Sequence, residues 1–151
     1  MNNLQNIIEA AKKEIGTAET PNNMQKYGEA YGWNGVAWCV IFIWYLFHTN
    51  GLDDLFPKVA HCNQVEAYAK EKGRWITGNY KPGDLVIFDY NKDLERDHIE
   101  LIIQTGAGYI RTIGGNVGDK VAEQNHFLEN ARIVGAYRPN YDSEDVTDIN
   151  V

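Results

Sequence analysis

Apolar residues recur at helical spacing through the first half of the chain. The first predicted helix carries its apolar stripe on Leu4, Ile7, Ile8, Ala11 and Ile15. Residues 23–31, 37–49 and 63–72 are also typical of helices, and a glycine or Asn50-Gly51 follows each of them. Residues 37–49 are apolar on nearly all sides, so we expect them to form the central helix.

From Trp75 onward, β-branched and aromatic residues replace helix formers, and turn residues appear at short intervals. This pattern predicts strands over residues 84–88, 98–103, 109–113 and 132–137, with a polar loop over residues 91–96. Helices first and an antiparallel sheet second predict an α+β fold, in which the N-terminal helices pack on a C-terminal antiparallel β-sheet.

The chain has 151 residues and no internal repeat, which favours one domain over residues 1–141. Residues 142–151 are rich in acidic side chains and are interpreted as the start of a linker. The formal charge of −7 disfavours binding to nucleic acid or to an anionic surface by net charge alone. A separate targeting domain after residue 151 would supply such binding.

The first six residues lack the basic and apolar regions of a signal peptide, so we expect a protein made in the cytoplasm. The longest apolar run, residues 36–47, is shorter than the roughly 20 residues needed to span a bilayer. No interaction with membranes is expected.

Cys39 lies in the first turn of the predicted central helix. The positive end of the helix dipole favours a thiolate there, as a nucleophilic cysteine requires. The alternative is that Cys39 is a small buried apolar residue.

A cysteine nucleophile needs an imidazole within hydrogen-bond reach, and four histidines are present. His48 lies too far along the same helix as Cys39, and His61 and His126 fall in loop-like stretches without a partner pattern. His98 opens a predicted strand next to Asp97, which suits a catalytic base. An exposed histidine at a strand end is the alternative.

A hairpin turn at residues 106–108 places His98 opposite Gly114-Gly115-Asn116, so Asn116 is a candidate to orient the imidazole. The alternative is an ordinary turn asparagine beside two glycines. Cysteine at a helix start, histidine at a strand start and an amide on the facing strand together match Cys-His-Asn acyl-transfer sites.

At these residues the sequence resembles the CHAP family, the cysteine, histidine-dependent amidohydrolases/peptidases of phage endolysins and bacterial autolysins. The resemblance covers roughly residues 15–141. It rests on the order and spacing of Glu14-Ile15-Gly16, Glu19, Asn22, Lys26-Tyr27-Gly28, Ala37-Trp38-Cys39, Phe42, Gly73-Arg74-Trp75, Lys81-Pro82-Gly83-Asp84-Leu85-Val86-Ile87-Phe88-Asp89, Asp97-His98-Ile99, Thr112-Ile113-Gly114-Gly115-Asn116 and Gly135-Ala136-Tyr137-Arg138-Pro139.

The resemblance implies a papain-like fold and cleavage of an amide in peptidoglycan. It assigns Cys39 as nucleophile, His98 as general base and acid, and Asn116 as a polar partner. The Cys39 backbone N–H would hold the oxyanion, and a thioester would form and be hydrolysed.

The chain departs from the family at Gly114, where many relatives carry the orienting glutamate. The same relatives tend to have glycine where this chain has Glu100, on the strand face of His98. We hypothesise that the two positions have exchanged and that Glu100 supplies the carboxylate. The alternative is that Asn116 alone orients His98 while Glu100 faces solvent.

No metal or other cofactor is predicted. Some relatives bind calcium just before the catalytic cysteine, but residues 28–36 offer few hard ligands beyond Glu29. His61 and Cys62 lack zinc spacing and are interpreted as loop and packing residues. Trp33, Trp38 and Tyr27 are candidates to line a substrate groove, although core packing is expected for at least one of them.

The leading functional prediction is the catalytic domain of a phage or prophage endolysin that acts, as a monomer, on Gram-positive peptidoglycan after release from the host cytoplasm. Either an N-acetylmuramoyl-L-alanine amidase or a stem or cross-bridge endopeptidase fits the residues. A catalytically silent wall-binding module is one alternative, and a cytoplasmic amidase acting on a small peptide conjugate is another.

Overall fold

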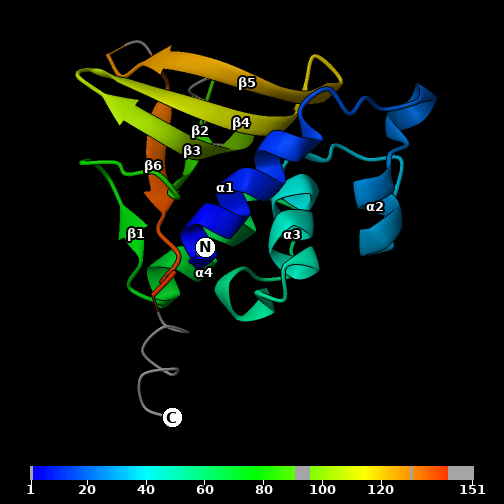
Figure 1. Ribbon diagram of the computed structural model, residues 1–151, viewed down its shortest axis with the longest axis horizontal. Coiled ribbons are helices and arrows are strands. Elements are labelled where there is room, and N and C mark those ends of the chain that lie inside the picture. The colour runs from blue at the N-terminus through cyan, green and yellow to red at the C-terminus, as the bar shows by residue number, and fades with distance from the viewer. Residues whose placement is uncertain (1, 91–95, 130, 143–151) are drawn as a thin grey trace.

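The computed structural model describes residues 2–90, 96–129 and 131–142. Among them, helices come first and the sheet follows (Figure 1). The elements are α1 (Asn3–Glu14), η1 (Pro21–Asn23), α2 (Lys26–Tyr31), α3 (Cys39–Thr49), η2 (Asp53–Leu55), α4 (Cys62–Glu71), β1 (Trp75–Ile76), β2 (Leu85–Phe88), β3 (His98–Gly106), β4 (Tyr109–Val117), β5 (Lys120–Phe127) and β6 (Ile133–Tyr137).

The helices form where the apolar spacing predicts them. α1 begins with a capping box in which Asn2 accepts from the Gln5 N–H and the Gln5 side chain accepts from the Asn2 N–H. The second helix starts later than expected, at Lys26, because Pro21–Asn23 forms a separate 3₁₀ turn and Gln25 provides the cap. Gly32 ends α2 in the left-handed conformation.

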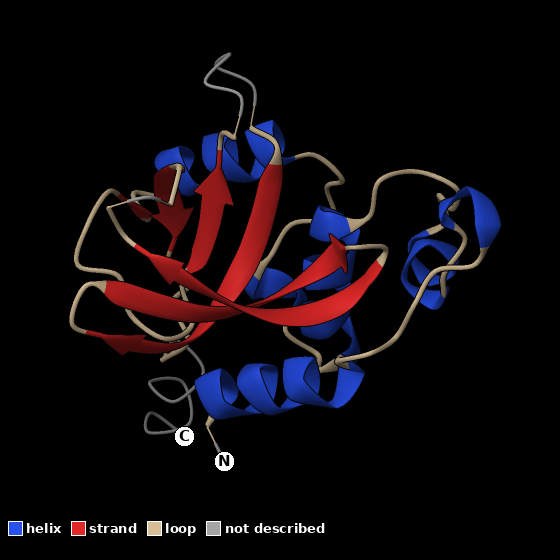
Figure 2. Cartoon of the chain, turned by 90° about the horizontal axis from the view of Figure 1, so that it is seen from above, coloured by secondary structure: helices blue, strands red, loops and turns tan. Residues whose placement is uncertain are grey.

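The six strands form one antiparallel sheet in the order β1-β6-β2-β3-β4-β5, so the predicted α+β architecture is confirmed. Figure 2 shows β4 and β5 as a long curved hairpin across the sheet. β3 and β4 meet at a tight turn after Gly106, and their register shifts between Ile102 and Gln104.

The prediction of the last strands was incomplete. β4 runs on to Val117 rather than ending at residue 113, and β5 was not predicted at all. The sequence of β5 is largely polar, since only one edge of the strand is paired and alternate residues face solvent. The predicted polar loop falls mostly on residues 91–95, outside the described residues, as do residues 143–151 of the predicted linker.

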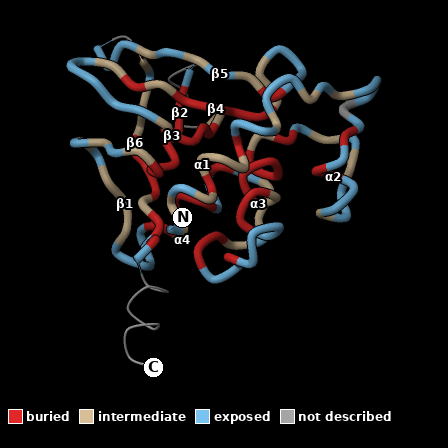
Figure 3. The backbone as a smooth tube through the Cα atoms, viewed as in Figure 1, coloured by how far each residue is buried: buried red, intermediate tan, exposed pale blue. Residues whose placement is uncertain are grey.

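The main core lies between the helices and one face of the sheet. α3 runs through its centre, and Figure 3 shows how completely this helix is buried. Ile87, Leu101 and Ile113 cover this core from the sheet, while Val86 and Ile102 point to a smaller core on the opposite face. Within the described residues, no helix has the length and apolar character needed to cross a membrane.

The two ends of the domain are joined. The Asn3 side chain donates to the carbonyl of Tyr141 at 3.2 Å, and the Tyr141 hydroxyl donates to the carbonyl of Gly83 at 2.7 Å. The packed structure therefore extends at least to Tyr141.

Candidate active site

Cys39 is the first residue of α3, where backbone N–H groups lack helical partners. Trp38 precedes it at the cap position, and no side chain caps this end of the helix. The Trp38 ring is fully buried and stacks on Tyr27, with ring centroids 5.5 Å apart. This packing fixes the start of α3, so the free N–H groups and the partly exposed sulfur have defined positions.

Gly115 lets β4 approach the start of α3 closely. A Cβ atom at this position would lie 2.6 Å from Cβ of Phe42 and 3.0 Å from the Trp38 ring. Only a residue without a side chain allows this approach, which brings the end of β4 beside Cys39.

His98 is the first residue of β3, and its side chain is 12% exposed. Its Nε2 lies 2.9 Å from Oε2 of Glu100 on the same strand face. The Cys39 side chain also interacts with the ring, and each group shifts the pKa of the other. The structure thus brings together Cys39, His98 and Glu100 in series.

The Glu100 carboxylate is fully buried and has three hydrogen-bond partners. Besides His98, Thr112 Oγ1 donates to Oε1 at 2.6 Å, and His126 Nε2 lies 2.8 Å from Oε1. A Cβ at Gly114 would lie 2.6 Å from Cγ of Glu100, so the glutamate occupies the space that the glycine leaves. Glu100 therefore does not face solvent, which contradicts the alternative interpretation of this residue.

Electrostatics in this group favour an ion pair. A hydrogen bond from Cys62, opposed by burial and aided by His98, holds the pKa of Cys39 well below its usual value. Burial lowers the pKa of His98, but hydrogen bonds with Cys39 and Glu100 outweigh it and raise that pKa to about 10. Burial likewise opposes the charge of Glu100, whose pKa nevertheless falls to about 2 through His126 and His98. These shifts favour a thiolate, an imidazolium and a carboxylate at neutral pH.

Cys62, interpreted from the sequence as a packing residue, also lies beside Cys39. It is the first residue of α4 and is 4% exposed, and its side chain interacts with that of Cys39. The same contact, together with burial, raises the pKa of Cys62 well above its usual value. The interaction thus favours the thiolate at Cys39 and the thiol at Cys62.

The candidate site opens into a hollow of about 330 Å³. Its lining residues come from the start of α3, the β2–β3 loop and the β4–β5 hairpin: Ala37, Cys39, Tyr90, Asp97, His98, Asn116, Val117 and Gln124. Asn116 sits in a left-handed conformation (φ 58°), within the register shift between Gly114 and Val117. Among the described residues no hydrogen bond links Asn116 to His98, whose orienting partner is Glu100.

Two of the three residues proposed from the sequence to line a groove are core residues. Trp38 and Tyr27 are 0% exposed, so their side chains cannot touch a substrate and that prediction is wrong for them. The Tyr27 hydroxyl instead donates to Glu14 at 2.7 Å. Trp33 is 45% exposed and packs edge-on against His61, the residue before Cys62. Trp33 therefore lies near the start of α4.

The interpretation of His126 as a loop residue was also wrong, because His126 belongs to β5 and reaches Glu100. Because β5 was not predicted, the direction of the His126 side chain could not be inferred. In a strand, residues two positions apart point to the same face, so His126 lies on the same face as Gln124. His48 pairs with Asp53 at 2.7 Å near the far end of α3. His61 precedes α4 at its cap position.

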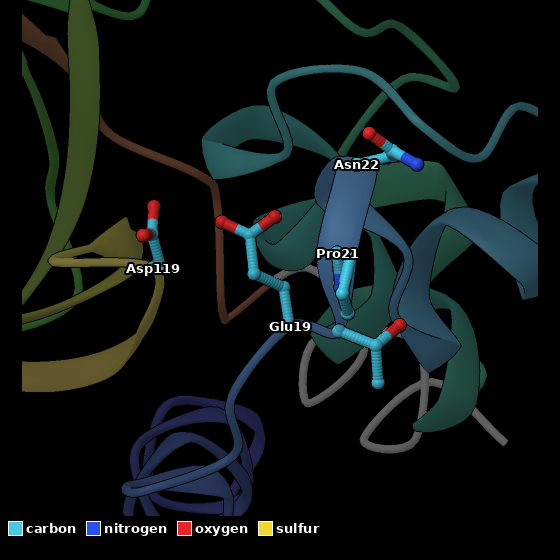
Figure 4. A pocket seen from close by; sticks show the side chains of 5 residues that line it. Glu19, Pro21, Asn22 and Asp119 are labelled. Carbon is cyan, nitrogen blue, oxygen red and sulfur yellow. The ribbon is translucent and has the colours of Figure 1, made fainter.

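A second hollow, of about 360 Å³, lies where the chain after α1 meets the β4–β5 turn. Glu19 and Asp119 reach it from these two segments (Figure 4), and none of its lining residues lines the Cys39 hollow. Within the described part of the chain, no group of three or more histidine, cysteine or acidic side chains could hold a metal ion.

Comparisons with solved structures reveal similar folds at low sequence identity. Ly7917 superposes with a TM-score of 0.60 at 9% identity, covering 90% of this chain and 62% of Ly7917. A structure of Ly7917 with the hydrolyzing product of MDP gives a TM-score of 0.56 at 11% identity, with the same coverage. A lipoprotein-like protein of the NLP/P60 family from Staphylococcus aureus gives 0.52 at 16% identity, covering 90% of this chain and 41% of that protein.

These likenesses confirm the papain-like α+β fold, and this chain spans less than two thirds of each of those proteins. No curated protein matches the sequence. The family model of the CHAP domain matches residues 30–116, more than half of the chain, and this segment contains Cys39, His98, Glu100 and Asn116. The chain therefore belongs to the CHAP domain family.

Proposed function

We propose that the chain is a peptidoglycan hydrolase that cleaves an amide bond with Cys39 as nucleophile. The observation that carries this proposal is the series of Cys39, His98 and Glu100, in which the Glu100 carboxylate holds the His98 ring and the pKa shifts favour a thiolate beside an imidazolium. Membership of the CHAP family supports it, as does the Ly7917 structure with the hydrolyzing product of MDP. Both an N-acetylmuramoyl-L-alanine amidase and a stem or cross-bridge endopeptidase use this chemistry.

In the first step, the Cys39 thiolate attacks the carbonyl carbon of the substrate amide. The negative charge moves to the carbonyl oxygen, which the uncapped backbone N–H groups at the start of α3 are placed to bind. His98 then gives its proton to the amide nitrogen, the carbon–nitrogen bond breaks, and the amine leaves. A thioester on Cys39 and a neutral imidazole remain.

In the second step, His98 takes a proton from water as the water oxygen attacks the thioester. The carbon–sulfur bond breaks, the carboxylic acid product leaves, and the thiolate and imidazolium are restored. Glu100 keeps the ring oriented throughout and stays ionised, since its pKa is about 2.

Asn116 and Trp33 are proposed to contact the substrate. Asn116 lines the hollow beside Cys39, where its amide can donate to or accept from a peptide group. Trp33 presents a half-exposed ring next to His61, which suits stacking on a sugar or an apolar stem-peptide side chain.

The biological setting is proposed to be a phage or prophage endolysin that acts as a monomer on Gram-positive walls. Residues 1–141 would be its catalytic domain and residues 142–151 the start of a linker. The charge of −7 gives no attraction to an anionic wall, which favours a separate wall-binding domain in the whole protein.

The test is mass spectrometry of fragments released from purified Gram-positive peptidoglycan. Wild type, Cys39→Ala and His98→Gln are compared with His48→Gln, which changes an exposed histidine paired with Asp53. Fragments split between the lactyl group and L-alanine indicate an amidase, and fragments cut within the peptide indicate an endopeptidase. Release by wild type and His48→Gln alone supports the proposal, whereas equal release by Cys39→Ala, or none by any protein, contradicts it.

A further inference from the structure

A second histidine holds the Glu100 carboxylate from the side opposite His98. His126 Nε2 lies 2.8 Å from Oε1, while His98 Nε2 lies 2.9 Å from Oε2. The two rings come from β5 and β3, two strands apart, and the glutamate bridges them. His126 lies outside residues 30–116, the segment that matches the family.

The two carboxylate oxygens have different surroundings. Oε1 accepts from Thr112 at 2.6 Å and is also bonded to His126, whereas His98 is the partner of Oε2. With Oε1 held by two donors from β4 and β5, the carboxylate cannot rotate about its last side-chain bond without breaking both contacts. Oε2 is therefore kept in line with the imidazole that faces Cys39.

Packing around His126 restricts this contact further. The Phe88 ring lies 5.0 Å from the His126 ring and 6.1 Å from the His98 ring, so one aromatic side chain packs against both imidazoles. The His126 side chain is 16% exposed and Glu100 is 0% exposed, so water competes weakly for the hydrogen bond.

From this geometry we infer that His126 is a positioning residue for the proposed reaction, acting through Glu100 on His98. Together with Thr112 it clamps Oε1 and thereby fixes the orientation of the catalytic imidazole. This inference rests on the proposed roles of Cys39 and His98. It adds a role for His126 on β5, which those two roles do not include.

The experiment compares His126→Phe, His126→Gln and Thr112→Val with wild type and His48→Gln. Phenylalanine keeps an aromatic ring beside Phe88 without a donor, and glutamine keeps a donor of similar reach. Thr112→Val removes the second donor to Oε1, together with the longer bond of 3.5 Å to the Gln124 carbonyl, so the inference stays testable if His126→Phe fails to fold. Turnover of peptidoglycan is one readout.

The second readout needs no substrate. It is the rate of alkylation of Cys39 by iodoacetamide as a function of pH, followed by mass spectrometry of the peptide that contains Cys39. Two titratable groups face the Glu100 carboxylate, His98 on the same strand and His126 on β5. Tyr90, which follows β2, also interacts with Glu100, and Cys39 interacts with His98. Loss of a donor to Oε1 raises the pKa of Glu100, so the acid limb of the profile moves to higher pH.

We expect kcat to fall roughly 10- to 100-fold in His126→Phe with KM unchanged, the factor that corresponds to one lost hydrogen bond to a charged group. Thr112→Val should act in the same direction, His126→Gln should recover part of the loss, and His48→Gln should match wild type. The acid limb of alkylation should move in His126→Phe and Thr112→Val.

A purely structural role would lower the thermal midpoint while leaving kcat and the alkylation profile of the folded protein as in wild type, and this result would overturn the inference. If no protein cuts peptidoglycan, the proposed function fails while the alkylation profiles still decide whether His126 acts on the Cys39–His98 pair.

Discussion

Asp84 and Glu100 are the two least exposed carboxylates among the described residues, at 1% and 0%. They lie close together in the sheet, Asp84 just before β2 and Glu100 in the neighbouring β3. Each accepts several hydrogen bonds, as a buried charge must. Burial and satisfied hydrogen bonding therefore do not distinguish them, but the chemistry of their partners does.

Arg138 donates two hydrogen bonds to the Asp84 carboxylate, of 2.8 Å from Nε and 2.9 Å from a terminal nitrogen. The Lys81 backbone N–H donates a third. A guanidinium stays charged throughout the pH range in which proteins fold, so this pair is permanent. Glu100 is held by two imidazoles and a hydroxyl, and imidazoles change charge and exchange protons. The same kind of carboxylate thus fixes the fold at Asp84 and is proposed to serve proton transfer at Glu100.

The largest expected effect is on turnover in Glu100→Gln. Glutamine keeps the shape of the side chain but removes the charge that stabilises the His98 imidazolium, so kcat should fall about 10²- to 10⁴-fold. Peptidoglycan turnover by the purified variant measures this, with circular dichroism to check its folding. Turnover within a factor of two of wild type would remove Glu100 from the mechanism.

The next effect concerns stability in Arg138→Met, which leaves the buried Asp84 charge without its partner. Breaking such a pair costs about 3–5 kcal/mol, so the denaturant midpoint should fall sharply while turnover per folded molecule is unchanged. Arg111→Met serves as a control, because Arg111 bonds only Asn125 on the exposed side of the β4–β5 hairpin among its described contacts. A loss of activity per folded molecule in Arg138→Met would mean that the two carboxylates are not separate in function.

A smaller effect is expected for Gly114→Ala, which forces a methyl group to within 2.6 Å of Glu100 Cγ. Displacing the carboxylate should cost about 1–3 kcal/mol of stability and lower kcat as well. Gly78→Ala is a suitable control, since nothing lies within 4 Å of its added Cβ. Equal behaviour of the two variants in denaturation and turnover assays would contradict the close contact.

The smallest effect is a shift in the pH profile. The folded-state pKa of His98 is raised to about 10, so the ion pair is present below that pH and is lost as pH rises through it. Removing the carboxylate in Glu100→Gln lowers the pKa of His98, and the alkaline limb of kcat should move to lower pH. Arg138→Met should keep the wild-type alkaline limb. An alkaline limb that moves equally in both variants would contradict the difference in role between Asp84 and Glu100.

The sequence predicted much of this arrangement because its signals are local. An apolar helix with Cys39 in its first turn and a strand starting at His98 are visible in residue order alone. The resemblance to the CHAP family added the exchanged carboxylate, because Gly114 stands where relatives carry glutamate and Glu100 where they carry glycine. Asn116 was placed correctly near the pocket, yet its expected contact with the imidazole is taken by Glu100.

The rest depended on contacts that residue order does not reveal. β5 is mostly polar, so its pairing with β4 and the direction of His126 had no apolar signal. Cys62 reaches Cys39 only because α4 begins beside the start of α3, a contact between helices. The burial of Trp38 and Tyr27 likewise follows from packing on Gly115 and Phe42 rather than from residue type.

The ultraviolet absorbance of the thiolate tests most directly whether His98 and Glu100 stabilise Cys39 in its charged form. It is taken as the difference between wild type and Cys39→Ala across a pH titration. We expect a thiolate already at neutral pH in wild type, and a titration displaced to higher pH when the same difference is measured in the Glu100→Gln background. A Cys39 that titrates as an ordinary thiol in wild type, or identically in both backgrounds, would contradict this expectation.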